Sequence, residues 1–182
     1  LGIKKKDVVT LYASNSWEWI VSYFSIARIG AIINPVNTML TPSEIKHVVN
    51  DCKAKAIITS SDKVQSIINI KNETSVSTLI TFGKAPQGAE AFNDLIEKET
   101  KPIEMPNISP EDLSTIGYTS GTTGHPKGAM QSHKSVVING AMTSQLHMRG
   151  PEDVLVSALP CPHVSANVMM TGMMMFGTKL VL

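Results

Sequence analysis

The sequence predicts an α/β fold with mostly parallel sheets flanked by helices. Short apolar runs, typical of buried strands, alternate along the chain with segments whose apolar residues recur at helical spacing. The hydrophobic content of 42% is ordinary for a globular protein with a packed core. A glycine- and hydroxyl-rich loop follows one of the predicted strands, and the carboxyl ends of parallel strands are where open α/β sheets bind ligands.

In the first half of the chain, capping residues indicate where helices begin. Asn15 is predicted to cap a helix, with Glu18 completing a capping box and Gly30 ending the helix. Thr41 is predicted to cap the next helix, which has Glu44 three residues on and runs to about residue 51. The other elements predicted here are strands at 8–13, 31–36, 54–59 and 78–82 and helices at 64–70 and 89–98.

Three prolines at four-residue intervals, Pro102, Pro106 and Pro110, predict a linker over residues 99–112. It would join a first α/β subdomain, residues 1–98, to the start of a second one, residues 113–182. The second part should contain strands at 113–118, 153–159 and 179–182 and helices at 133–148 and 163–176. The last helix is rich in methionine but too short to span a bilayer, so we expect a buried core helix.

Composition excludes several classes of protein. The formal net charge of +1 gives no electrostatic basis for binding nucleic acid. Cys52 and Cys161 are too few for a disulfide framework, and no secretory signal is apparent, so a cytoplasmic location is predicted. The sequence stops inside a predicted apolar strand. We therefore expect the chain to be part of a longer protein. Self-association through that strand edge stays open.

The most informative stretch is residues 118–128, which read YTSGTTGHPKG. It has four Ser or Thr hydroxyls, three glycines and one lysine, and it has no acidic residue. Glycines let the backbone approach an anion closely, while hydroxyls and an ammonium group add donors. A polyphosphate site is therefore predicted, formed by Thr119, Ser120, Gly121, Thr122, Thr123, Gly124 and Lys127.

This loop matches neither of the two best-known phosphate-binding patterns. In a P-loop the lysine follows Gly and precedes Ser or Thr, but Lys127 follows Pro126 and precedes Gly128, and the G-x-G-x-x-G pattern is incomplete. The loop closely resembles that of the adenylate-forming superfamily, which includes acyl-CoA synthetases. The resemblance implies the large N-terminal domain of such an enzyme. It extends to ASNSWEW at 13–19, GA at 30–31, NPVN at 34–37, TPSEI at 41–45 and the Ser132-His133 pair.

A second segment, LPCPHV at 159–164, resembles the Leu-Pro-x-Phe-His segment that borders the acyl pocket in this superfamily. The resemblance implies that His163 belongs to the substrate pocket. Pro162 replaces the usual Phe, which puts the shape of the pocket in question. A histidine that merely caps a helix is an equally weighted alternative for His163.

The resemblance implies a two-step reaction. A carboxylic acid, expected to be a fatty acid, attacks the α-phosphorus of ATP with Mg²⁺, and coenzyme A then takes the acyl group. The family's catalytic lysine would lie outside this chain, and no acid–base catalyst is predicted within it. A catalytically inactive nucleotide-binding or structural fragment is the main alternative. A dinucleotide-dependent oxidoreductase is disfavoured, because the glycine fingerprint is absent after the first strand.

Overall fold

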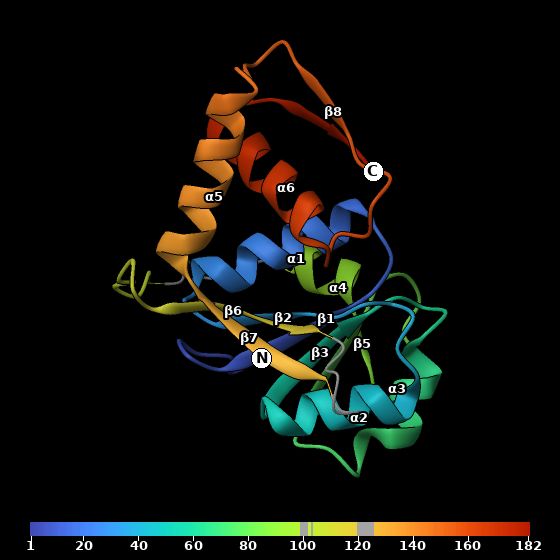
Figure 1. Ribbon diagram of the computed structural model, residues 1–182. Helices are drawn as coiled ribbons and strands as arrows, with labels where there is room; N and C mark the ends of the chain where they lie inside the picture. The colour runs from blue at the N-terminus through green and yellow to red at the C-terminus, as the bar shows by residue number, and fades with distance from the viewer. Residues whose placement is uncertain (99–101, 103, 120–125) are drawn as a thin grey trace.

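A computed structural model of the chain describes residues 1–98, 102, 104–119 and 126–182. Its main sheet has seven strands in the order β5-β4-β3-β1-β2-β6-β7 (Figure 1). Neighbouring strands are parallel except for β6 and β7, which form an antiparallel hairpin. The mostly parallel α/β fold is thus confirmed. The strands are β1 (Val8–Tyr12), β2 (Ile32–Pro35), β3 (Ala54–Thr59), β4 (Thr78–Thr81), β5 (Glu90–Ala91), β6 (Leu113–Thr119) and β7 (Lys127–Ser132).

Helices cover both faces of this sheet. On one face lie α2 (Pro42–Asp51) and α3 (Val64–Lys71), and on the other lie α1 (Trp17–Arg28) and α4 (Phe92–Glu97) (Figure 1). Two further helices, α5 (His133–Leu146) and α6 (Val164–Phe176), lie beyond α1. They are followed outward by a separate parallel pair, β8 (Val154–Val156) and β9 (Lys179–Val181).

Alternating side chains of the strands fill two apolar cores, one on each face of the sheet. Leu11 of β1 and Ile33 of β2 pack with Trp19 of α1. Ile57 of β3 packs with Ile45 of α2 in the opposite core. All five side chains are almost completely buried, and burying each contributes about 1.5–3 kcal/mol. Burial on both faces explains why β1 to β4 are rich in apolar residues without a strict alternation of apolar and polar ones.

The predicted start of α1 is wrong by one residue. Ser16, not Asn15, is the N-cap, and its hydroxyl accepts a hydrogen bond from the Trp19 N–H at 3.3 Å. The side chain of Asn15 is engaged elsewhere in the chain, as described below. The cap at Thr41 is confirmed, because Thr41 and Glu44 form the expected capping box. Gly30 follows α1 at a φ of 68°, a conformation that favours glycine.

Three predicted stretches differ from the structure. Residues 127–132 form β7, but no strand was predicted there. Their sequence KGAMQS lacks an alternation of apolar and polar residues, and most of its side chains are exposed. The helix predicted at 89–98 divides into β5 and the shorter α4. The expectation of a buried core helix is only partly met by α6: Met170 is fully buried, but Val164 in the first turn is 55% exposed and Met174 in the last turn is 59% exposed.

Strands from both sides of the proline-containing segment pair within one sheet, as Ile33 of β2 is the register partner of Thr115 of β6. The division into subdomains at residues 99–112 stays a prediction. In the described part of the chain, no helix is long and apolar enough to cross a membrane.

Candidate functional site

The β6–β7 hairpin holds the two ends of the predicted phosphate loop side by side. Thr119 is the last residue of β6, Lys127 is the first residue of β7, and the two are register partners. Both side chains are exposed to solvent. Loop residues 120–124, which include Ser120, Gly121, Thr122, Thr123 and Gly124, lie outside the described residues. Donors at both ends of the loop are therefore brought together.

Two side chains anchor the strand that leads into this loop. Asn34, which is fully buried in β2, donates its side-chain N–H to the carbonyl oxygen of Ile116 in β6 at 2.8 Å. Its own carbonyl oxygen accepts a hydrogen bond from the Thr10 hydroxyl at 2.9 Å. Further along β6, the Tyr118 hydroxyl donates to the carboxylate of Asp51 at the end of α2. Burial and this hydrogen bond raise the pKa of Tyr118, so the hydroxyl stays protonated as a donor.

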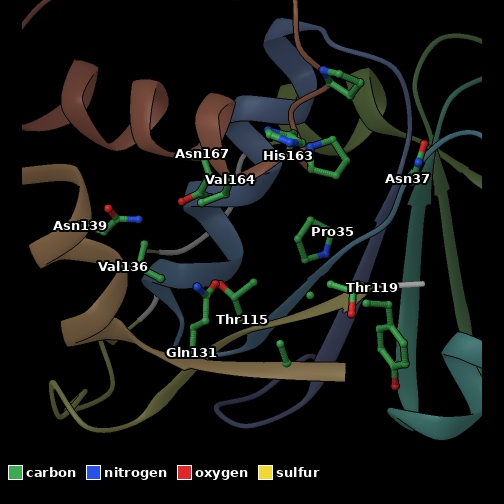
Figure 2. A pocket seen from close by; sticks show the side chains of 15 residues that line it. Pro35, Asn37, Thr115, Thr119, Gln131, Val136, Asn139, His163, Val164 and Asn167 are labelled. Atoms are coloured by element: carbon green, nitrogen blue, oxygen red, sulfur yellow. The ribbon is translucent and has the colours of Figure 1, made fainter. Parts of the chain in front are cut away.

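A cavity of about 420 Å³ lies next to the end of β6. Its walls come from the carboxyl end of β2, the β6–β7 hairpin, one side of α5 and the start of α6 (Figure 2). The lining has both apolar and uncharged polar side chains, together with the imidazole of His163. The fifteen lining residues are Pro35, Asn37, Thr115, Gly117, Tyr118, Thr119, Ala129, Gln131, Val136, Asn139, Pro160, Pro162, His163, Val164 and Asn167.

For His163 the helix-capping alternative is confirmed, whereas its membership of a substrate pocket stays a prediction. His163 is the N-cap of α6, where its Nδ1 accepts a hydrogen bond from the Ser165 N–H at 3.2 Å. It also lines the cavity. Because Nδ1 acts as the acceptor, the proton of the neutral imidazole is on Nε2. Nε2–H is thus the hydrogen-bond donor of this ring.

Asn167 is a second polar group on α6 that lines the cavity (Figure 2). Its side-chain N–H donates to the hydroxyl of Tyr23 in α1 at 2.7 Å. Tyr23 is 2% exposed, and burial raises the pKa of its hydroxyl, so a neutral phenol holds the amide in place. Sequence reasoning missed Asn167, since its partner lies 144 residues away and no motif marks the pair.

The two cysteines and His133 lie outside the cavity lining. Burial raises the pKa of both thiols, Cys52 and Cys161, to about 11, so neither is a thiolate nucleophile near neutral pH. His133 begins α5, and burial lowers the pKa of its imidazole. In the described part of the chain, no group of three His, Cys, Asp or Glu side chains could hold a metal ion. The cavity therefore offers hydrogen bonds and apolar contacts.

Comparison with known proteins gives a consistent match. The family model described as AMP-binding enzyme matches residues 1–182. The chain is 33% identical to 4-coumarate–CoA ligase 2 of Solanum tuberosum over 172 residues, which are 90% of this chain and 31% of that protein. The chain spans about a third of the length of the curated relatives that it matches.

Solved structures agree with that match. A putative long-chain-fatty-acid CoA ligase from Rhodopseudomonas palustris CGA009 superimposes with a TM-score of 0.91 at 25% identity, covering 99% of this chain and 45% of that one. ATP-bound MatB from Rhodopseudomonas palustris superimposes with a TM-score of 0.83 at 30% identity, covering 100% of this chain and 36% of that one.

Proposed function

Since the chain belongs to the AMP-binding enzyme family, we propose that it forms the phosphate-loop part of an acid–CoA ligase. The reaction would be the activation of a carboxylic acid with ATP, followed by transfer of the acyl group to coenzyme A. The names of the relatives and the ATP-bound neighbour support this proposal. One observation carries it: a single cavity is lined by Thr119 at the phosphate loop and by His163 at the predicted acid pocket.

In the first step, a carboxylate oxygen of the acid attacks the α-phosphorus of ATP. An oxygen–phosphorus bond forms, the bond from the α-phosphorus to the bridging oxygen breaks, and pyrophosphate leaves with the electron pair. Charge grows on pyrophosphate, so fixed donors around it stabilise the transition state more than the ground state. We assign that role to Thr119, Lys127 and the loop residues between them. In the second step the sulfur of coenzyme A attacks the acyl carbon. A carbon–sulfur bond forms, the bond from that carbon to the AMP oxygen breaks, AMP leaves with the electron pair, and the thiol proton goes to solvent.

We assign the acid to the cavity beside this loop. A volume of about 420 Å³ falls within the range of small-molecule pockets. None of its lining residues is Lys, Arg, Asp or Glu, which suits an uncharged acyl chain. The Nε2–H of His163 would donate to the carboxylate or to the adenylate's carbonyl oxygen. An aliphatic fatty acid is our first candidate, and an aromatic acid is the second.

The residues for Mg²⁺ are not assigned, because the described part of the chain has no suitable set of ligands. ATP itself fits the donors at Thr119 and Lys127, an exposed hydroxyl and an ammonium group facing across the hairpin. Coenzyme A has no contact that we assign to this chain.

Acid-dependent exchange of pyrophosphate into ATP tests the first step. A panel of aliphatic and aromatic acids is supplied to the complete enzyme of which we propose that the chain forms a part, to its Lys127→Ala variant and to Lys84→Ala, a control at an exposed lysine outside the site. We expect exchange that requires an acid, is reduced at least about tenfold by Lys127→Ala, and is unchanged in the control. ATP binding without any exchange would leave only the nucleotide-binding alternative.

A further inference from the structure

Asn15 connects the beginning of the chain to a segment near its end. Its side-chain Nδ2–H donates to the carbonyl oxygen of Leu159 at 2.9 Å. Its Oδ1 accepts from the N–H of Cys161 at 2.7 Å. The partners are separated by 144 and 146 residues in sequence. The side-chain amide of Asn15 thus binds a main-chain acceptor and a main-chain donor of the same segment, as the main chain of a paired strand would.

The sequence of that segment makes the second hydrogen bond important. Pro160 and Pro162 have no main-chain N–H, so Cys161 supplies the only main-chain donor over residues 160–162. The Cys161 side chain is fully buried in the core next to α1. Without Asn15, this N–H would lose its partner at a partly buried position, which is unfavourable.

Residues on either side of Cys161 form one wall of the cavity. Pro160, Pro162 and His163 line it, whereas Cys161 packs into the apolar core and does not line the cavity. The His163 N–H donates to the Pro160 carbonyl oxygen at 2.8 Å, which closes a turn. The cavity-lining residues belong to this turn, and the hydrogen bonds of Asn15 attach the segment to the connection between β1 and α1.

We propose that Asn15 is a positioning residue for the acid site, and that its two hydrogen bonds set where Pro160, Pro162 and His163 stand in the cavity wall. This inference rests on the proposed function of the cavity. A helix-capping role does not account for Asn15, because Ser16 caps α1. Asn15 acts through the wall and does not line the cavity itself.

The test compares three variants of the full chain. Asn15→Ala removes both hydrogen bonds. Asn15→Asp keeps an oxygen to accept from Cys161 and loses the donor to Leu159. Ser16→Ala is the matched control, since it removes the neighbouring helix cap and leaves both hydrogen bonds of Asn15 in place. Amide hydrogen exchange at Cys161 and the melting temperature are measured for each variant by NMR and calorimetry.

Ligand affinities provide the readout that a purely structural role would not change. The probes are cinnamate, an aromatic acid, decanoate, an aliphatic acid, and ATP. In Asn15→Ala we expect Cys161 amide exchange about tenfold faster. Both acids should bind more weakly, by unequal factors of up to about tenfold, so that the ratio of their affinities changes, with ATP affinity within twofold. Asn15→Asp should keep the Cys161 amide protected and lose less acid affinity. Ser16→Ala should change only the melting temperature.

Two results would overturn the inference. One is unchanged acid affinity and acid ratio in a folded Asn15→Ala, and the other is equal loss of acid and ATP affinity. Failure of the proposed function looks different, because neither acid then binds the unsubstituted chain. In that case the rate of amide hydrogen exchange at Cys161 still shows whether Asn15 holds the cavity wall. If the Cys161 amide in Asn15→Ala is as protected as in the unsubstituted chain, the positioning role of Asn15 is refuted.

Discussion

Asn34 donates a hydrogen bond from its side chain to the main-chain carbonyl of Ile116, which joins β2 to β6 at 2.8 Å. The strand that leads into the predicted phosphate loop is therefore held by a buried side chain as well as by the pairing of main chains. Thr10 completes the group by donating to Asn34. A buried amide satisfied on both its polar atoms favours one register of the neighbouring strand.

Replacing Asn34 with Ala should destabilise the fold. The change leaves the Ile116 carbonyl and the Thr10 hydroxyl without this partner inside the sheet, and each such loss costs about 1–3 kcal/mol. We expect the free energy of unfolding, measured by urea titration, to fall by about 2–4 kcal/mol. Asn69→Ala at an exposed position of α3 is the control and should change it by less than about 0.5 kcal/mol. Equal losses at the two positions would contradict the role of Asn34.

Replacing Tyr118 with Phe should weaken ATP binding with little loss of stability. The substitution removes only the hydroxyl that donates to Asp51, so the residue next to Thr119 loses its attachment to α2. We expect the Kd for ATP, measured by calorimetry, to rise about three- to tenfold. Asp51→Asn keeps an acceptor for the hydroxyl and should have a smaller effect. Identical Kd values for wild type and Tyr118→Phe would show that this contact does not position the loop.

The Cys161 thiol should make stability decrease in alkaline solution. Burial raises its pKa from 9.0 to about 11. Between these values the unfolded chain loses the proton while the folded chain keeps it, so the unfolded state binds fewer protons and stability falls as pH rises. Chemical denaturation between pH 8 and pH 11 should show a smaller decline for Cys161→Ala than for the unsubstituted chain. Parallel curves for the two proteins would disprove a contribution from this thiol.

Replacing Gly140 with Ala should destabilise the contact between α5 and α6. A Cβ at this position would stand 2.6 Å from Cγ2 and 2.8 Å from Cβ of Thr171. In an open helix the same change would stabilise by about 1 kcal/mol, but overpacking typically costs about 1–3 kcal/mol. We therefore expect a lower melting temperature. Gly150→Ala is the control, as its added Cβ would meet nothing within 4 Å. A higher melting temperature for Gly140→Ala would mean that the helices separate easily.

The elements that were predicted correctly have local causes. The strand at 54–59 is apolar except for Lys55 and Thr59, and the helix after Thr41 has its cap, its proline and Glu44 within four residues. β7 was missed because it is formed by pairing with β6 and not by its own apolar pattern. Its identification required the tertiary structure.

The candidate site shows the same contrast between local and long-range signals. Thr119, Lys127 and His163 were found through motifs, and the roles predicted for them stay predictions. Asn15 was expected to cap a helix because an Asn before an apolar helix is a common capping signal. Its true partners, Leu159 and Cys161, are too distant in sequence for any local pattern to indicate.

The attachment of Asn15 to the segment around Cys161 also constrains the order in which the molecule is assembled. Joining residues 144 apart carries a loop-closure entropy that local helices and neighbouring strands do not face. A ribosome must have added residue 161 before the wall of the cavity can be fixed to β1 and α1, which were made long before. The cavity can thus be completed only after the first strands of the sheet have been made and can already have paired.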